Sequence, residues 1–309
     1  MMSRILKLFP LVIFLSVVLA GTGRAGVDSP IIRDAAGRVI QVKVPFTRII
    51  SMYSAHTHNL KDLGLDKEIL GVCPGDDWKG KPVFSYHNGL EKFLAAKPDL
   101  VLVRPMIDRG YPQLVEGLER AGIAVVSFQP SDVAEMSGYW MALGQLTGKT
   151  VPAREMISRF QKEIARIKTI TDALPHKKRV YFEAIHDRMK TFTPGSMAIF
   201  ALETAGGVNV AADAPAVRDT NIAFYGKERI LSKAGEIDVF LAQNGTMNQP
   251  TVSMIANEPG FGVIKAVQEG QVFIVDEKLV SRPTLDLLDG VRTIGDILYP
   301  QAFGKAGTP

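Results

Sequence analysis

The sequence predicts an α/β protein with two Rossmann-like lobes, each holding a mainly parallel sheet, joined by one long α-helix. Three observations support this class. Short apolar, β-branched segments alternate with helical patterns, the alternation occurs twice along the chain, and one long amphipathic segment separates the two rounds. Because alternating strands and helices place helices on both faces of a parallel sheet, each round predicts one lobe.

Residues 1–25 have the pattern of a secretory signal. Basic Arg4 and Lys7 precede an apolar run, and Gly23-Arg24-Ala25 offers the small residues that a signal peptidase requires. The run of about 13 residues is shorter than the roughly 20 of a membrane helix. We therefore expect cleavage near Ala25 and a periplasmic protein, with an uncleaved anchor as the alternative. No cysteine lies near the cut, so we expect no lipid anchor.

The charge of the exported chain argues against a nucleic-acid partner. The whole chain carries +4, and three of the positive charges belong to the predicted signal, which leaves +1. Lysines and arginines alternate with acidic residues in the remainder, whereas phosphate binding needs a concentrated basic face. The single cysteine, Cys73, excludes an internal disulfide, and we expect it to be a small core residue.

The first lobe is expected over residues 26–149. Its predicted strands are short apolar, β-branched runs at 48–52, 70–72, 100–103 and 123–128, and helical patterns lie between them at 57–63, 90–96 and 112–121. Gly64 and Gly122 follow two of these helices, at the position where glycine commonly ends a helix. The spacing predicts successive strand–helix units.

One long helix is expected over residues 150–174. Apolar Met156, Phe160, Ile164 and Ile167 recur at spacings of three and four residues, and charged side chains occupy the opposite face. Pro175 closes the segment. A helix of about 24 residues is roughly 36 Å long, enough to link two lobes rigidly. The alternative is an ordinary surface helix within one domain.

The second lobe is expected over residues 175–309. Strand patterns lie at 179–184, 239–242 and 272–275, and helical patterns lie at 197–205 and 285–298. Between the lobes, the segment from Gly144 to Thr150 is one residue short of a phosphate-binding loop and follows a helical pattern rather than a strand. A helix–turn–helix junction explains it better.

Familiar catalytic motifs are absent from the sequence. It contains no G-x-S-x-G, no H-E-x-x-H and no paired cysteines, so neither a nucleophile elbow nor a zinc site is indicated. We therefore expect no enzyme and no resident cofactor. A secreted metal-dependent hydrolase is the alternative from another class, and an adhesion or structural protein is a third.

Polar residues follow strands in both predicted lobes, and they are the candidate ligand contacts. In open α/β sheets, ligands lie at the carboxyl ends of strands, and clefts between domains are favoured small-molecule sites. The imidazoles could bind a metal, hydrogen-bond an anion, or cap a helix, and an arginine could clamp a carboxylate or phosphate. The candidates are Tyr53, Ser54, His56, His58, Tyr86, His87, Arg104, His186 and Arg282.

The chain resembles the periplasmic binding proteins for ferric siderophores, haem and cobalamin, the class with a rigid helix between its lobes. The resemblance covers nearly all of the chain after residue 25. It is carried by these segments in order: Ile32–Ile40, Arg48–Ser51, Leu63–Leu65, Ile69–Val72, Glu91, Lys97–Leu102, Ala205–Ala211 and Arg282-Pro283.

The resemblance implies that a bulky complex is captured between the lobes and delivered to the permease and ATPase of an ABC importer at the inner membrane. One exposed acidic residue per lobe docks onto the permease in this family, and Glu91 and Glu228 fit those positions. One departure is that Thr57-His58 stands where the family often has Thr-Glu. This imidazole suits a metal complex or an anion.

We expect the solute to be an iron complex, either a ferric siderophore or haem, bound by a monomer. Cobalamin is the close alternative, and a small oxyanion or a bare metal ion is a further one. Only Trp78 and Trp140 are available to stack on a large macrocycle. The sequence does not decide which solute is bound, or whether any histidine ligates a metal directly.

Overall fold

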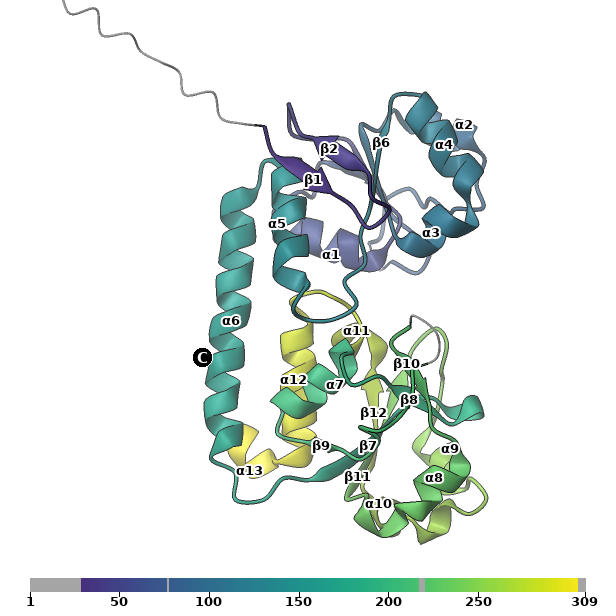
Figure 1. Ribbon diagram of the computed structural model, residues 1–309, viewed down its shortest axis with the longest axis vertical. Coiled ribbons are helices and arrows are strands. Elements are labelled where there is room, and N and C mark those ends of the chain that lie inside the picture. The colour runs from purple at the N-terminus through teal and green to yellow at the C-terminus, as the bar shows by residue number, and fades with distance from the viewer. Residues whose placement is uncertain (1–28, 77, 217–219, 305–309) are drawn as a thin grey trace, which may run out of the picture.

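The computed structural model describes residues 29–76, 78–216 and 220–304. The predicted signal therefore lies outside the described residues. Two α/β lobes face each other, and a single long helix, α6, runs along one side of both (Figure 1). None of the described helices is long and apolar enough to span a membrane. The predicted fold class is confirmed.

The N-terminal lobe opens with a hairpin and continues as a parallel sheet. Strands β1 (Ile31–Arg33) and β2 (Val39–Gln41) pair antiparallel, as the family resemblance implied. The sheet has the order β4-β3-β5-β6, formed by Ile69–Gly71, Ile49–Ser51, Leu100–Val103 and Ala124–Ser127. Its helices are α1 (Ser54–Asp62), α2 (Leu90–Ala96), α3 (Pro105–Gly110), α4 (Pro112–Arg120) and α5 (Met136–Thr147).

Helix α6 (Thr150–Asp172) is the predicted long helix, with 23 residues. Phe160 lies at its centre, 5.5 Å between ring centroids from Trp140 of α5 and 6.3 Å from Phe200 of the opposite lobe. The segment from Gly144 to Thr150 is the turn between α5 and α6, and Gly148 has a left-handed conformation there, with φ 71°. The expected helix–turn–helix junction is confirmed.

The C-terminal lobe has a mixed sheet of order β10-β8-β7-β11-β12, with β9 also paired to β7. Strands β7, β9, β11 and β12 run parallel, while β8 and β10 add an antiparallel edge that the sequence pattern did not reveal. The strands are Arg179–Ile185 (β7), Lys190–Phe192 (β8), Val208–Asn209 (β9), Ile222–Phe224 (β10), Val239–Asn244 (β11) and Val272–Asp276 (β12).

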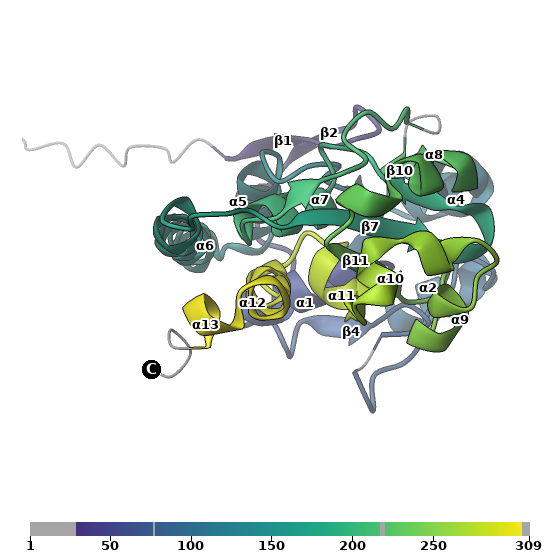
Figure 2. The same ribbon diagram turned by 90° about the horizontal axis from the view of Figure 1, so that it is seen from below.

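Seven α-helices are described in the C-terminal lobe, and several are very short. Figure 2 shows α12 and α13 gathered near α6, at one side of the molecule. The helices are α7 (Met197–Thr204), α8 (Lys227–Ser232), α9 (Val252–Ala256), α10 (Lys265–Gln268), α11 (Glu277–Val280), α12 (Leu287–Leu298) and α13 (Pro300–Phe303). Three short 3₁₀ helices lie at His186–Arg188, Ala234–Glu236 and Phe261–Val263.

One hydrophobic core runs through both lobes by way of α6. It includes Trp140 and Leu143 of α5, Phe160 and Ile167 of α6, and Leu202 of α7. Two smaller cores lie on the other faces of the two sheets. Because the largest core continues across the helix, the lobes are fastened together by buried apolar surface as well as by the chain itself.

Candidate functional site

Two predicted ligand contacts, Tyr53 and Arg104, meet at the point where the order of strands in the N-terminal sheet reverses. Strands β3 and β5 are neighbours, and the chain leaves them toward opposite edges of the sheet, which makes their carboxyl ends a topological switch point. Tyr53 follows β3 and Arg104 follows β5. The guanidinium carbon of Arg104 lies 5.2 Å from the centre of the Tyr53 ring, within range of a cation–π interaction.

Arg282 brings a second positive charge to this point from the opposite lobe. Burial raises the pKa of Tyr53, and the positive charges of Arg104 and Arg282 oppose that rise. Both arginines are half-buried, and neither guanidinium forms a hydrogen bond or ion pair with a residue that the structure describes, although the carboxylate of Asp286 interacts electrostatically with Arg282. Partly desolvated guanidinium groups without a direct hydrogen-bond partner have the chemistry to bind an anion.

An aromatic cavity lies on the N-terminal lobe, at the starts of α2 and α4. It has a volume of about 520 Å³ and is open to solvent. The rings of Tyr86 and Tyr111 form one wall, with centroids 4.5 Å apart, and exposed His87 contacts Tyr111 edge-on at 5.4 Å. The structure therefore brings Tyr86 and His87 together with a partner, Tyr111, that the sequence pattern did not single out.

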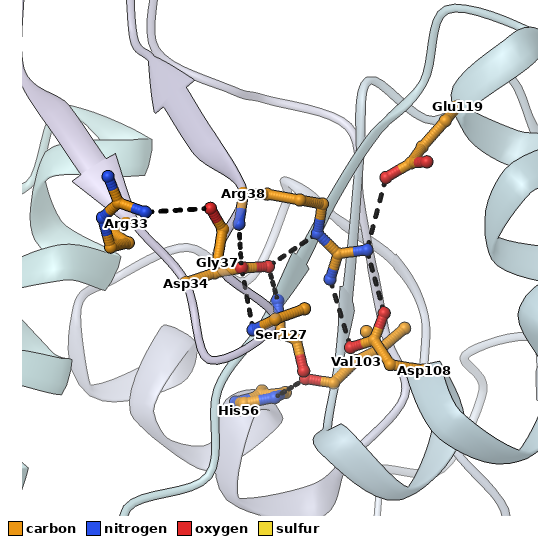
Figure 3. A network of polar contacts seen from close by, with 10 residues as sticks. Arg33, Asp34, Gly37, Arg38, His56, Val103, Asp108, Glu119 and Ser127 are labelled. Carbon is orange, nitrogen blue, oxygen red and sulfur yellow. Dashed lines mark hydrogen bonds and ion pairs between the residues drawn. The ribbon is translucent and has the colours of Figure 1, made fainter.

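His56 does not face a cleft, and the prediction that it contacts a ligand is wrong. Its side chain is fully buried, with Nε2 2.9 Å from the carbonyl oxygen of Val103 and Nδ1 2.6 Å from the hydroxyl of Tyr139. Burial lowers the pKa of His56 to about 4. Both ring nitrogens therefore have hydrogen-bond partners, and the neutral imidazole links β5 to α5 within the lobe. The Val103–His56 contact is visible in Figure 3.

His58 and Ser54 also have partners within the protein. Nδ1 of His58 lies 3.0 Å from Oδ2 of Asp286 in the opposite lobe, and this contact lowers the pKa of Asp286. The hydroxyl of Ser54 is buried against the Cys73 thiol at 3.4 Å. Cys73 itself is buried, as expected, and burial raises its pKa. His58 is thus a contact between lobes, while Ser54 packs against its neighbour.

His186 lies at the end of β7 as predicted, but its ring points into the C-terminal lobe. Nδ1 is 3.0 Å from Oε1 of Glu183, and the ring packs against Phe261. The hydrogen bond to Glu183 raises the pKa of His186, while burial raises the pKa of Glu183. With 5% of its surface exposed, His186 belongs to a buried ion-pair network rather than to the solute site. The prediction that it contacts a ligand is therefore wrong.

The two tryptophans are poorly placed to stack on a macrocycle. Trp140 is fully buried in the core. Trp78 is half-buried, and the ammonium groups of Lys61 and Lys81 lie 4.7 and 5.0 Å from its ring. Among the described residues, no group of three or more His, Cys, Asp or Glu side chains could hold a metal ion.

A polar network on the N-terminal lobe braces the helix that follows Arg104. Arg38 of the hairpin turn pairs with Asp34 at 2.7 Å and with Asp108 of α3 at 2.9 Å, and it also contacts Glu119 of α4 (Figure 3). Asp34 in turn accepts a hydrogen bond from the backbone nitrogen of Ser127, at the end of β6. The hairpin therefore fixes α3 against the sheet.

The two predicted docking residues are exposed and lie on different lobes. Glu91 is in the first turn of α2, and Glu228 is in the first turn of α8. Both carboxylates are thus accessible from solvent. Their docking role stays a prediction.

Sequence reasoning missed several residues because only the fold brings them together. Glu277 acts electrostatically on Tyr53 from α11, while Asn59 and Tyr139 form a buried chain with His56. Tyr53 and Arg104 were singled out because each is a polar residue that follows a strand. Glu277 has the same kind of position, because it comes directly after β12.

Two facing α/β lobes joined by one long helix, with Arg104 and Arg282 close to Tyr53, have the architecture of a two-lobed binding protein. The chain belongs to the periplasmic binding protein family, whose model matches residues 50–279. This membership confirms the resemblance to substrate-binding proteins of ABC importers.

Individual relatives agree with this assignment. The chain is 24% identical to the uncharacterized ABC transporter substrate-binding lipoprotein YvrC of Bacillus subtilis over 284 residues, or 88% of this chain and 86% of that protein. It is 22% identical to the vitamin B12-binding protein of Vibrio cholerae over 256 residues, or 81% and 88%. A crystal structure of a possible iron-binding, periplasmic solute-binding protein from Staphylococcus epidermidis superposes with a TM-score of 0.71 at 26% identity, covering 83% of this chain and all of that one.

Proposed function

We propose that this protein is the periplasmic substrate-binding component of an ABC importer and that it captures an anionic iron complex, a ferric siderophore or haem, between its lobes. The observation that carries the proposal is the pair of arginines Arg104 and Arg282, whose guanidinium groups act on Tyr53 from facing lobes and have no direct hydrogen-bond or ion-pair partner among the described residues. Catecholate siderophores carry negative charge when loaded with iron, and haem carries carboxylates. Either would provide anionic oxygens as hydrogen-bond partners for the two guanidinium groups.

Tyr53 and the aromatic cavity complete the proposed site. A tyrosine oxygen is a ligand that ferric haem accepts in proteins, and the Tyr53 ring lies beside the cationic head of Arg104. The cavity walled by Tyr86 and Tyr111 suits a flat, conjugated part of the solute. Aromatic surface and positive charge together favour an aromatic anion over a neutral solute such as cobalamin.

Delivery of the solute would use the outer surfaces of the two lobes. Glu91 and Glu228 are our candidates for contact with basic pockets of a permease, because each is an exposed acidic residue at the start of a helix, one per lobe. The permease and its ATPase are the proposed partners, and the protein is proposed to act as a monomer.

The test is a binding titration of the purified chain, residues 26–309, by tryptophan fluorescence and absorbance. The probes are a ferric tris-catecholate complex and haemin, which are anionic, together with ferrioxamine B, which is cationic, and cyanocobalamin, which is neutral. We expect binding of an anionic probe only. Arg104→Ala and Arg282→Ala should each weaken it about tenfold or more, as expected for loss of a charged hydrogen bond.

Arg109→Ala is the matched control, because Arg109 is an exposed arginine on α3 and its loss changes the net charge equally. It should leave the affinity nearly unchanged. Tight binding of cyanocobalamin or ferrioxamine B would contradict the proposal. So would equal losses for all three arginine variants, because general attraction of an anion by the whole lobe would then explain the binding.

A further inference from the structure

A chain of buried hydrogen bonds runs from β5 through His56 to Asn59 of α1. Because the carbonyl oxygen of Val103 can only accept, the neutral His56 ring donates to it from Nε2 at 2.9 Å, which leaves Nδ1 bare. The hydroxyl of Tyr139 then donates to Nδ1 at 2.6 Å. The direction of every bond up to Tyr139 is therefore fixed by the chemistry of the groups.

The side-chain amide of Asn59 uses both of its hydrogens and its oxygen. Its nitrogen donates to the Tyr139 hydroxyl oxygen at 3.2 Å and to the carbonyl oxygen of Pro283 at 2.9 Å. Its oxygen accepts from the indole nitrogen of Trp140 at 3.0 Å. Asn59 is fully buried, so water cannot take the place of its amide. Loss of the amide would leave these partners without a hydrogen bond.

The bond from Asn59 to Pro283 crosses from the N-terminal to the C-terminal lobe. Two hydrogen bonds between described residues join the lobes directly, and both come from α1. The other, between His58 and Asp286, has side chains 26% and 39% exposed, so solvent weakens it. The buried bond from Asn59 is the stronger constraint, and its acceptor Pro283 is bonded in sequence to Arg282.

We propose that Asn59 is a positioning residue, which fixes the spacing of the two lobes where α1 meets the loop before α12 and thereby places Arg282 relative to Arg104. The amide is held on one side by α5, through Tyr139 and Trp140, and it holds the loop before α12 on the other. An apolar residue at this position would fill the space but could not hold Pro283. The placement of Arg282 serves the proposed solute site, whereas the spacing of the lobes exists whether or not a solute is bound.

The test measures that spacing without a solute. Nitroxide labels are placed at Arg120→Cys on α4 and Glu269→Cys after α10, both exposed positions in different lobes, in a Cys73→Ala background. Pulsed electron–electron double resonance then gives the distribution of distances between the two labels, and hence between the lobes, in the purified protein. We expect a narrow distribution in the parent protein and a broader one, with a longer mean distance, in Asn59→Ala.

Tyr139→Phe is the matched control. It removes a hydroxyl from the same set of buried hydrogen bonds and should lower the melting temperature, but it leaves the bond from Asn59 to Pro283 in place. It should keep the narrow distribution. His58→Ala, which removes the exposed contact, should broaden the distribution less than Asn59→Ala does. Asn59→Ser replaces Asn59→Ala if circular dichroism shows that the alanine variant is unfolded.

Two results would overturn the proposal. An Asn59 variant that is folded and keeps the parent distribution would show that the lobes are spaced by other contacts. Equal broadening in the Asn59 variant and in Tyr139→Phe would show that general loosening of the lobe, rather than this one bond, sets the spacing. Neither result depends on which solute binds, so failure of the solute proposal and failure of this one are distinguishable.

Discussion

Nδ1 of His56 lies 2.6 Å from the hydroxyl oxygen of Tyr139, in a part of the N-terminal lobe that water does not reach. The hydroxyl can donate to that nitrogen only while the ring is neutral. Burial accordingly lowers the pKa of His56 from 6.5 to about 4. The folded protein therefore resists protonation at a position where the unfolded chain does not.

This difference predicts that stability falls in mild acid. Above pH 6.5 both states hold a neutral His56, and the contribution to the free energy of unfolding is complete. As the pH falls from 6.5 toward 4, the unfolded chain takes up a proton that the folded one excludes, at a cost of about 2 kcal/mol between pH 7 and pH 5. Urea unfolding at the two pH values measures this loss.

His56→Gln is the control for the acid effect, because its amide can still donate to Val103 and accept from Tyr139 but does not titrate in this range. The wild-type protein should lose about 2 kcal/mol more than the variant between pH 7 and pH 5. An identical pH dependence in the two proteins would show that carboxylates or His186 cause the change instead.

Arg38→Met is expected to destabilise the N-terminal lobe. The change keeps the aliphatic stem but removes the guanidinium from Asp34, whose side chain is fully buried, and from Asp108. Leaving a buried carboxylate without its cation should lower the free energy of unfolding by about 2 kcal/mol. Arg33→Met removes one exposed hydrogen bond, to Gly37, and should cost at most about 0.5 kcal/mol. Equal losses in urea unfolding would contradict a special role for Arg38.

Two glycines of α5 should respond oppositely to alanine. A Cβ at Gly144 would lie 2.7 Å from the Cβ of Ala153 in α6 and 2.8 Å from the carbonyl oxygen of Lys149, so the helices would have to separate. We expect Gly144→Ala to cost about 1–3 kcal/mol. Gly138 has open space around it, and Gly138→Ala should stabilise the helix by about 0.5 kcal/mol. Thermal unfolding of both variants checks the prediction, and stabilisation by Gly144→Ala would contradict it.

The parallel strands were predictable from their composition, because a strand that is covered on both faces must be apolar on both faces. Leu100–Val103 is apolar at every position, as a strand covered on both faces must be, and all four of its residues are buried. Strands β8 and β10 give a weaker signal, because each has only three residues. Strand β10 forms the edge of the sheet and pairs with β8, which pairs with β7; Lys190 is half-buried there and Phe224 is exposed.

The candidate site was predictable by position but not by side-chain direction. The carboxyl end of β3 drew attention to the segment from Tyr53 to His58, whose role in binding stays a prediction. Tyr53 is the extended residue that precedes α1 and lies beside Arg104, while His56, in the first turn of α1, packs edge-on against the Tyr53 ring from the buried side. The direction of the His186 side chain was likewise not visible in the sequence, because it is set by the hydrogen bond to Glu183 of β7.

The continuous apolar core along α6 has a consequence for the energetics of capture and release. Wide separation of the lobes would expose the surface that Phe160 buries between Trp140 and Phe200. A solute that binds between the lobes, as proposed, would therefore meet a site that is already assembled, and little of its binding energy would be spent on ordering the protein. The same rigidity gives a bound solute no spontaneous exit through wide opening. We therefore expect its release to need work done on the lobes from outside, by whichever partner receives it.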